Sequence, residues 1–208
     1  MCWYMIYLLR HGEIEDPTIR RFIGQTDCAL SERGRAQADH WIKWMQGKRI
    51  ASIFCSDLIR SSETAKIISR GLNVAISIRP ELKEIHLGEW DGQTLQAIRS
   101  DFPTEWEERG KLLGTYRPPR GESFADLYKR VIPVFDQIAE TATDPVLIVG
   151  HAGVNRMILC GVLGMPIRKL FSIRQNYGAL NLIYYSKDEY EVIVVNYDPF
   201  GLKKVNFK

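Results

Sequence analysis

Short apolar runs alternate with amphipathic segments along most of the chain. Four runs are apolar enough to be buried strands, and they cover residues 4–9, 51–55, 74–78 and 146–149. The segments around them have apolar residues three or four positions apart and predict helices at about 31–46, 57–70, 122–141 and 153–163. Two last apolar runs predict a hairpin that turns near residues 187–189, with strands at about 178–185 and 190–195. The pattern predicts a three-layer α/β/α fold, with a mostly parallel central sheet and helices on both faces.

Residues 84–121 interrupt this alternation. They contain only short helical stretches, near residues 94–100 and 103–111. Irregular segments of this length inside compact domains are usually functional. We therefore expect residues 1–208 to form one domain with an inserted, lid-like region at about 84–121.

The composition narrows the classes of partner. A net charge of +3 without long runs of Lys or Arg argues against nucleic acid. No stretch approaches the roughly 18 apolar residues of a membrane helix, and the apolar N-terminus is interpreted as a core strand and not as a leader. The 4 cysteines form no C-x-x-C pair, so neither a zinc site nor a disulfide framework is indicated. These features favour a cytoplasmic protein with reduced thiols and no membrane partner.

Two histidines directly follow predicted strands. His11, in an Arg-His-Gly-Glu motif, follows the first strand, and His151 follows the strand at 146–149. Arg60 lies in the first turn of the helix after the second strand. Because the carboxyl ends of parallel strands meet at one edge of a sheet, we expect these side chains and Arg10 to converge there. Two imidazoles and two guanidiniums suit the binding of a phosphate group.

The same residue types indicate a reaction at phosphorus. A transferring phosphoryl group spreads charge over its oxygens, so it needs positively charged surroundings and an in-line nucleophile. An imidazole among arginines is held neutral, so one of the two histidines can be the nucleophile while the other donates to a phosphate oxygen. A carboxylic acid must also protonate the leaving group. Among the nearby loop carboxylates we favour Glu84 and interpret Glu89 and Asp91 as solvated. No metal-ligand spacing accompanies them, so no metal or other cofactor is expected.

Seven blocks of the sequence carry a more specific pattern, and in order they are residues 8–13, 21–27, 30–34, 55–65, 82–92, 121–124 and 146–153. Together they resemble the successive blocks of the histidine phosphatase (phosphoglycerate mutase-like) superfamily. The resemblance implies that His11 is transiently phosphorylated and that Glu84 acts as the proton donor. The phosphate pocket that it implies consists of Arg10, His11, Arg60 and His151.

The resemblance implies a metal-independent phosphomonoesterase that acts through a phosphohistidine on a small phosphorylated metabolite. Residues 121–124 and 171–178 are similar to α-ribazole phosphatases and to broad-specificity relatives, so α-ribazole 5'-phosphate is one candidate substrate. One departure from the family pattern is Pro17, because many members have a phosphate-contacting asparagine at that position.

Two other functions remain open. A phosphoglycerate mutase would use the same phosphohistidine, but the family's mutases have a longer lid segment with paired arginines, whereas Arg117 and Arg120 here are separated by two prolines. A catalytically silent relative would bind a phosphorylated ligand only, and it would be expected to have lost a pocket residue. All the pocket residues are present, which argues against a silent relative, and the short lid segment without paired arginines favours hydrolysis over the mutase reaction. The expected partner is a small phosphorylated substrate, and a homodimer is left open.

Overall fold

A six-stranded sheet forms the centre of the computed structural model, which describes residues 3–15, 21–186 and 189–200. The strands are β1 (Tyr4–Arg10), β2 (Ser52–Cys55), β3 (Ile76–Ile78), β4 (Val146–Gly150), β5 (Leu180–Ser186) and β6 (Glu189–Tyr197). Their order is β3-β2-β4-β1-β5-β6. The first four are mutually parallel, while β5 is antiparallel to both β1 and β6. The predicted pairing of the last two strands is confirmed, although most of its turn lies outside the described residues.

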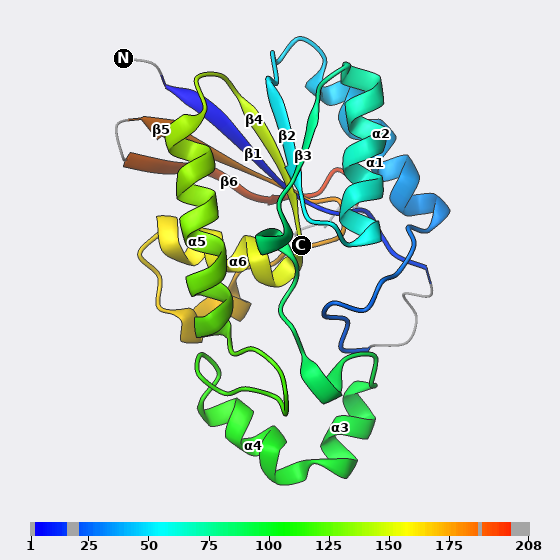
Figure 1. Cartoon of the computed structure of the whole chain (residues 1–208), viewed down its shortest axis with the longest axis vertical. Coiled ribbons are helices and arrows are strands. Elements are labelled where there is room, and N and C mark those ends of the chain that lie inside the picture. Colours follow the sequence, from blue (N-terminus) through cyan, green and yellow to red (C-terminus); the bar gives the residue numbers. More distant parts are fainter. Residues whose placement is uncertain (1–2, 16–20, 187–188, 201–208) are drawn as a thin grey trace, which may run out of the picture.

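Helices cover both faces of this sheet, which confirms the three-layer prediction (Figure 1). On one face lie α1 (Glu32–Met45) and α2 (Ile59–Leu72), and on the other lie α5 (Phe124–Thr141) and α6 (Ala152–Val162). Alternate residues of β1 enter the two cores. Leu8 packs among the residues of α5 and α6, and Leu9 packs among those of α1 and α2. Burial on both sides explains why the run is continuously apolar.

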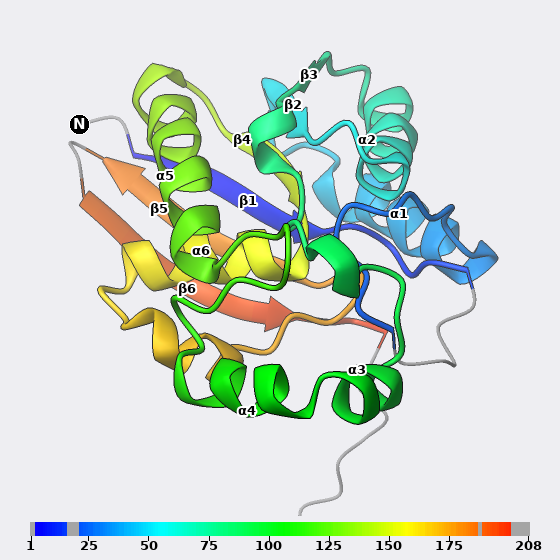
Figure 2. The same cartoon turned by 60° about the horizontal axis from the view of Figure 1, so that its bottom comes forward.

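The segment between η1 (Pro80–Leu82) and α5 lies beyond the carboxyl ends of the parallel strands (Figures 1 and 2). Its elements are η2 (Gly88–Trp90), α3 (Leu95–Asp101) and α4 (Pro103–Lys111). Trp90 is fully buried, and its ring lies 5.8 Å from that of Phe22, 6.4 Å from that of Phe102 and 5.5 Å from that of Tyr116. The indole therefore packs this segment together and is not available to a ligand. No helix among the described residues is long and apolar enough to span a membrane.

The N-terminus of α1 abuts the loop that carries His11. Ser31 caps this helix, with its side chain accepting a hydrogen bond from the Gly34 backbone N–H at 3.0 Å. A Cβ atom added at Gly34 would overlap the backbone carbonyl of Glu13. Main-chain atoms on both sides of this contact leave no flexible side chain to move aside. The close approach of helix and loop therefore requires glycine at this position.

Gly34→Ala should lower the free energy of unfolding by about 1–3 kcal/mol, the usual cost of overpacking, because the new methyl group overlaps the Glu13 carbonyl. Gly110→Ala is the matched control, since Gly110 also lies in a helix and its added Cβ would meet no atom within 4 Å. Alanine favours a helix over glycine by up to about 1 kcal/mol, so this variant should be unchanged or more stable. Chemical denaturation measures both. Equal stabilities of the two variants would contradict the requirement for glycine.

Candidate active site

His11 lies where β1 leaves the sheet. Its backbone N–H donates to the Gly150 carbonyl at 3.1 Å, and its carbonyl accepts from the Gly178 N–H at 3.0 Å. Its side chain is buried, and Nδ1 lies 2.8 Å from the Gly12 carbonyl oxygen. Because a carbonyl only accepts, Nδ1 must carry the ring proton. Nε2 then holds the lone pair, and no described residue forms a hydrogen bond with it.

His151 follows β4 at the same edge of the sheet, and its ring centroid is 5.1 Å from that of His11. Its Nε2 lies 2.7 Å from the hydroxyl oxygen of Ser56, while Nδ1 is buried without a partner among the described residues. Burial lowers the pKa of both histidines well below the usual value, and the charges of Arg10 and Arg60 lower it further. Both imidazoles are therefore neutral near pH 7.

Arg10, the last residue of β1, is held by main-chain and aromatic contacts. Its Nη1 donates to the Gln175 carbonyl at 2.7 Å, and its guanidinium carbon lies 3.7 Å from the Tyr177 ring centroid. Gln175 is fixed in turn by the buried amides of Asn155 and Asn181, at 3.1 and 2.8 Å. The Nε atom of Arg10 is buried and has no partner among the described residues. The guanidinium is thus anchored on one side and retains an unused donor.

Arg60 lies in the first turn of α2 and is almost fully buried. It donates to the carbonyls of Gly24 and Thr26, at 2.6 and 2.8 Å. The loop that supplies these carbonyls is fixed by Asp91, whose carboxylate accepts from the three backbone N–H groups of residues 24–26 at 2.8–3.0 Å. The interpretation of Asp91 as a solvated carboxylate is therefore wrong. This residue positions Arg60 through the loop.

Glu84 is buried between the lid segment and α6. Its Oε1 accepts from the Ile85 backbone N–H and its Oε2 from that of Gly153, both at 2.9 Å. Gly153 is the second residue after His151, so the carboxylate lies beside the first turn of α6. A Cβ at Gly153 would overlap Oε1, so the glycine makes room for the acid.

Arg130 of α5 holds the segment that carries Glu84. Its guanidinium forms a bidentate pair with the carboxylate of Glu122, with hydrogen bonds of 2.8 and 2.7 Å. It also donates to the carbonyl of Lys83 at 3.1 Å. Sequence reasoning did not assign this role to Arg130 or Glu122, and the only signal was the position of Glu122 in one of the matched blocks. Glu89 forms an ion pair of 2.9 Å with the exposed Arg120, in keeping with its interpretation as a solvated carboxylate.

The structure brings the predicted site residues together at the carboxyl edge of the parallel strands. These residues are Arg10, His11, Arg60, Glu84 and His151. Pro17 lies outside the described residues. Among the residues that the structure does describe, no three His, Cys, Asp or Glu side chains are grouped as metal ligands.

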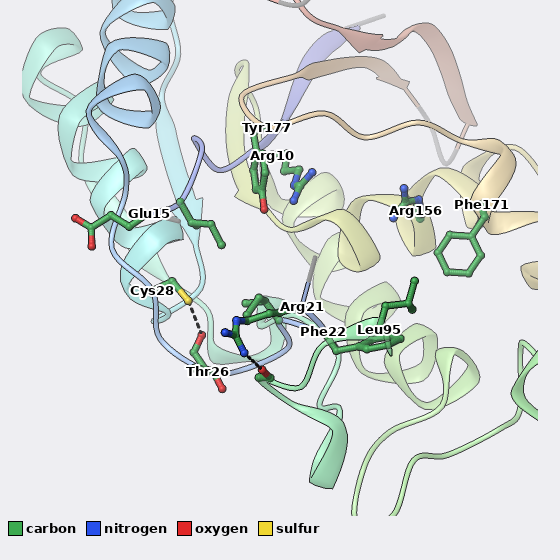
Figure 3. Close-up of a pocket in the computed structure, with 13 residues that line it drawn as sticks. Arg10, Glu15, Arg21, Phe22, Thr26, Cys28, Leu95, Arg156, Phe171 and Tyr177 are labelled. Atoms are coloured by element: carbon green, nitrogen blue, oxygen red, sulfur yellow. Dashed lines mark hydrogen bonds between the residues drawn. The ribbon is translucent and has the colours of Figure 1, made fainter. Parts of the chain in front are cut away.

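A cavity of about 930 Å³ opens beside Arg10 and Tyr177 (Figure 3). The other residues that line it are Ile14, Glu15, Arg21, Phe22, Ile23, Thr26, Cys28, Gly92, Leu95, Arg156 and Phe171. They come from the loop after β1, the lid, α6 and η3 (Ile167–Ser172). Sequence reasoning identified only Arg10 among the lining residues, because no local pattern shows which of these segments approach one another.

The sequence profile of the histidine phosphatase superfamily (branch 1) matches residues 6–198. A glucosyl-3-phosphoglycerate phosphatase of Mycolicibacterium vanbaalenii is 30% identical over an alignment of 173 residues that covers 78% of this chain and 75% of the relative. A probable phosphoglycerate mutase, GpmB, of Yersinia pestis is 30% identical over an alignment of 186 residues that covers 88% of this chain and 85% of the relative. The solved α-ribazole phosphatase of Shigella flexneri has the same fold, with a TM-score of 0.85 at 23% identity over 92% of this chain and 96% of that one. The chain therefore belongs to branch 1 of the histidine phosphatase superfamily.

Proposed function

We propose that this protein is a metal-independent phosphomonoesterase that hydrolyses a small phosphorylated metabolite through a phosphohistidine at His11. The observation that carries this proposal is the state of the His11 ring. The bond from Nδ1 to the Gly12 carbonyl leaves the lone pair on Nε2, and the lowered pKa keeps this imidazole neutral. A neutral, buried and oriented imidazole is suited to nucleophilic attack.

The proposed reaction comprises two half-reactions. In the first, Nε2 of His11 attacks phosphorus, the bond from phosphorus to the ester oxygen breaks, and Glu84 gives its proton to the departing alkoxide. In the second, the Glu84 carboxylate takes a proton from water while the water oxygen attacks phosphorus. The bond from phosphorus to nitrogen then breaks, which releases inorganic phosphate and restores His11.

The groups around His11 supply the charge that phosphoryl transfer needs. Arg10 Nε and His151 Nδ1 are both buried without a partner among the described residues, and an unpaired buried polar group costs about 1–3 kcal/mol. A phosphate oxygen would satisfy each of them, provided that Nε2 of His151 accepts the Ser56 hydroxyl and its Nδ1 carries the proton. With the guanidiniums of Arg10 and Arg60, these donors stabilise the transferring group without a metal ion.

The contacts of the lid arginines favour hydrolysis over the mutase reaction. Arg117 donates two hydrogen bonds to the Asp126 carboxylate, at 2.5 and 2.6 Å, and Arg120 forms an ion pair with Glu89 at 2.9 Å. Both guanidiniums are therefore paired with carboxylates of this chain, so the lid does not present the paired arginines that are typical of the family's mutases. α-Ribazole 5'-phosphate remains a candidate substrate, since a cavity of about 930 Å³ is large enough for a nucleoside-like body.

The nucleophile can be identified by rapid quench with a ³²P-labelled phosphomonoester in the presence of a chelator. Wild type should accumulate acid-labile, base-stable label, and His11→Ala should show none and lose turnover, because it lacks the attacking Nε2. His86→Ala is the matched control, because His86 is exposed and its side chain takes no part in the site. Label that persists in His11→Ala, or activity that depends on Mg²⁺ or Mn²⁺, would refute the proposal.

Glu84→Gln should affect substrates according to their need for a proton. Turnover of an alkyl phosphate should fall by roughly 10²–10⁴-fold, the usual contribution of a general acid. Formation of the phosphoenzyme from p-nitrophenyl phosphate should fall much less, because nitrophenolate leaves without a proton. The control is Glu89→Gln, in the exposed ion pair, which should retain wild-type rates. Equal losses on both substrates would assign the proton transfer to another residue.

The two neutral histidines should make the ligand-free protein less stable in acid. Their pKa values are lower in the folded than in the unfolded state, so unfolding takes up protons below about pH 6.5. The free energy of unfolding should therefore fall with pH, by up to about 1.4 kcal/mol per unit for each histidine. In His11→Asn the slope of the free energy of unfolding against pH, between about pH 6.5 and 5, should be smaller by the contribution of the one proton that His11 takes up on unfolding. Urea denaturation across this range measures it, and identical slopes would show that His11 is not held neutral.

A further inference from the structure

The cavity beside Arg10 contains two further arginines without acidic partners. Arg156 of α6 donates from Nε to the Ile173 carbonyl at 2.9 Å, and Arg21 donates to the Gly92 carbonyl at 3.0 Å. Neither forms an ion pair within the part of the chain that the structure describes. Among the described residues of the lining, the one carboxylate belongs to Glu15, on the far side of the cavity from Arg156 (Figure 3).

A third arginine stands behind the cavity wall. The guanidinium carbon of Arg109, in α4, lies 5.6 Å from the ring centroid of Phe22, 5.8 Å from that of Phe171 and 5.4 Å from that of Trp106. The Phe171 ring also lies 5.3 Å from the guanidinium carbon of Arg156. Aromatic faces attract cations, but they neutralise no charge.

These arginines form a positively charged cluster with no ion-paired carboxylate among the described residues, although the charge of Glu84 acts on Arg156 and raises its pKa. Burial lowers the pKa of both Arg109 and Arg156, which shows that their charges have lost part of their hydration. Such charges are costly unless they are paired. Besides burial, the charge of Arg156 lowers the pKa of Arg10, so the cluster is close enough to the phosphate pocket to interact with it.

We propose that Arg156 and Arg21, supported by the charge of Arg109 behind the cavity wall, recognise a second anionic group on the substrate, either a carboxylate or a second phosphate, while the ester phosphate lies at Arg10 and His11. This inference rests on the proposed phosphatase function and adds its substrate class. Arg156 follows His151 by five positions on α6, which is about 7–8 Å along the helix axis. The substrate is therefore a small metabolite whose two anionic groups are a few bonds apart. α-Ribazole 5'-phosphate, with a single phosphate, would leave the cluster unfilled.

Matched substrates test this inference and separate the two kinds of anion. In the carboxylate arm, 3-phosphoglycerate is compared with glycerol 3-phosphate, in which a hydroxymethyl group replaces the carboxylate. In the phosphate arm, fructose 1,6-bisphosphate is compared with fructose 6-phosphate. In one arm, kcat/KM for the doubly anionic member should be greater by about tenfold or more, as expected for a charge-assisted hydrogen bond. The arm that shows the preference identifies the anion.

Substitution of the cluster should remove this preference. In Arg156→Gln the ratio of kcat/KM within the preferred pair should fall toward one, and the ratio itself cancels any general effect on catalysis. Arg21→Gln, at an exposed position, should lower the same ratio without disturbing the core. Arg70→Gln is the control with the same change of charge, because Arg70 is exposed in the last turn of α2, and it should keep the wild-type ratio.

The outcomes distinguish this inference from the proposed function. Two results would overturn the second anion site alone. In the first, the protein hydrolyses p-nitrophenyl phosphate but the kcat/KM ratio of the paired substrates is near one in both arms. In the second, neither arginine variant changes that ratio. Absence of hydrolysis with every substrate would remove the phosphatase function and the inference with it. Conversion of 3-phosphoglycerate to 2-phosphoglycerate without release of phosphate would support the anion site and identify the reaction as that of a mutase.

Discussion

The register of the parallel pair β1 and β4 is the constraint on which the rest of the site depends. Arg10 pairs with Gly150, so the next residue on each strand is a histidine, and the two rings meet at 5.1 Å. Side chains alternate between the faces of a sheet, so a slip by one residue would turn every side chain of one strand to the wrong core. The apolar cores on both faces prevent this slip. The hydrophobic packing that stabilises the fold thereby also sets the spacing of His11 and His151.

The arginines divide into two groups according to whether a carboxylate accepts any of their hydrogen bonds. Those at the site donate to main-chain carbonyls, as Arg10 does to Gln175 and Arg156 to Ile173. A carbonyl orients a guanidinium without cancelling its charge, which therefore remains available to an anion. Those that hold the scaffold also pair with carboxylates, as Arg130 does with Glu122 in addition to its bond to the Lys83 carbonyl. The second group fixes the loops and helices on which the first group depends.

The Glu84 carboxylate shows how several elements together position one acid. Two backbone N–H groups hold its oxygens, the missing side chain of Gly153 makes room for it, and Arg130 anchors the preceding residues to α5. The lid continues directly from this segment, with the buried Trp90 at its centre. The acid is thus buried and held by main-chain contacts, while the segment that follows it forms a wall of the cavity.

The sequence by itself determined the order of strands and helices, because burial imposes a period of two on a strand and 3.6 on a helix. It also determined that Arg10, His11, Arg60 and His151 converge, since residues at the exits of neighbouring parallel strands must share an edge. Only the tertiary structure decided the role of Asp91, the proton on Nδ1 of His11, and the approach of Arg21, Arg109 and Arg156 to one cavity. These features depend on contacts between residues far apart in the chain. Local periodicity carries no information about such contacts, because it reflects only which face of an element is buried.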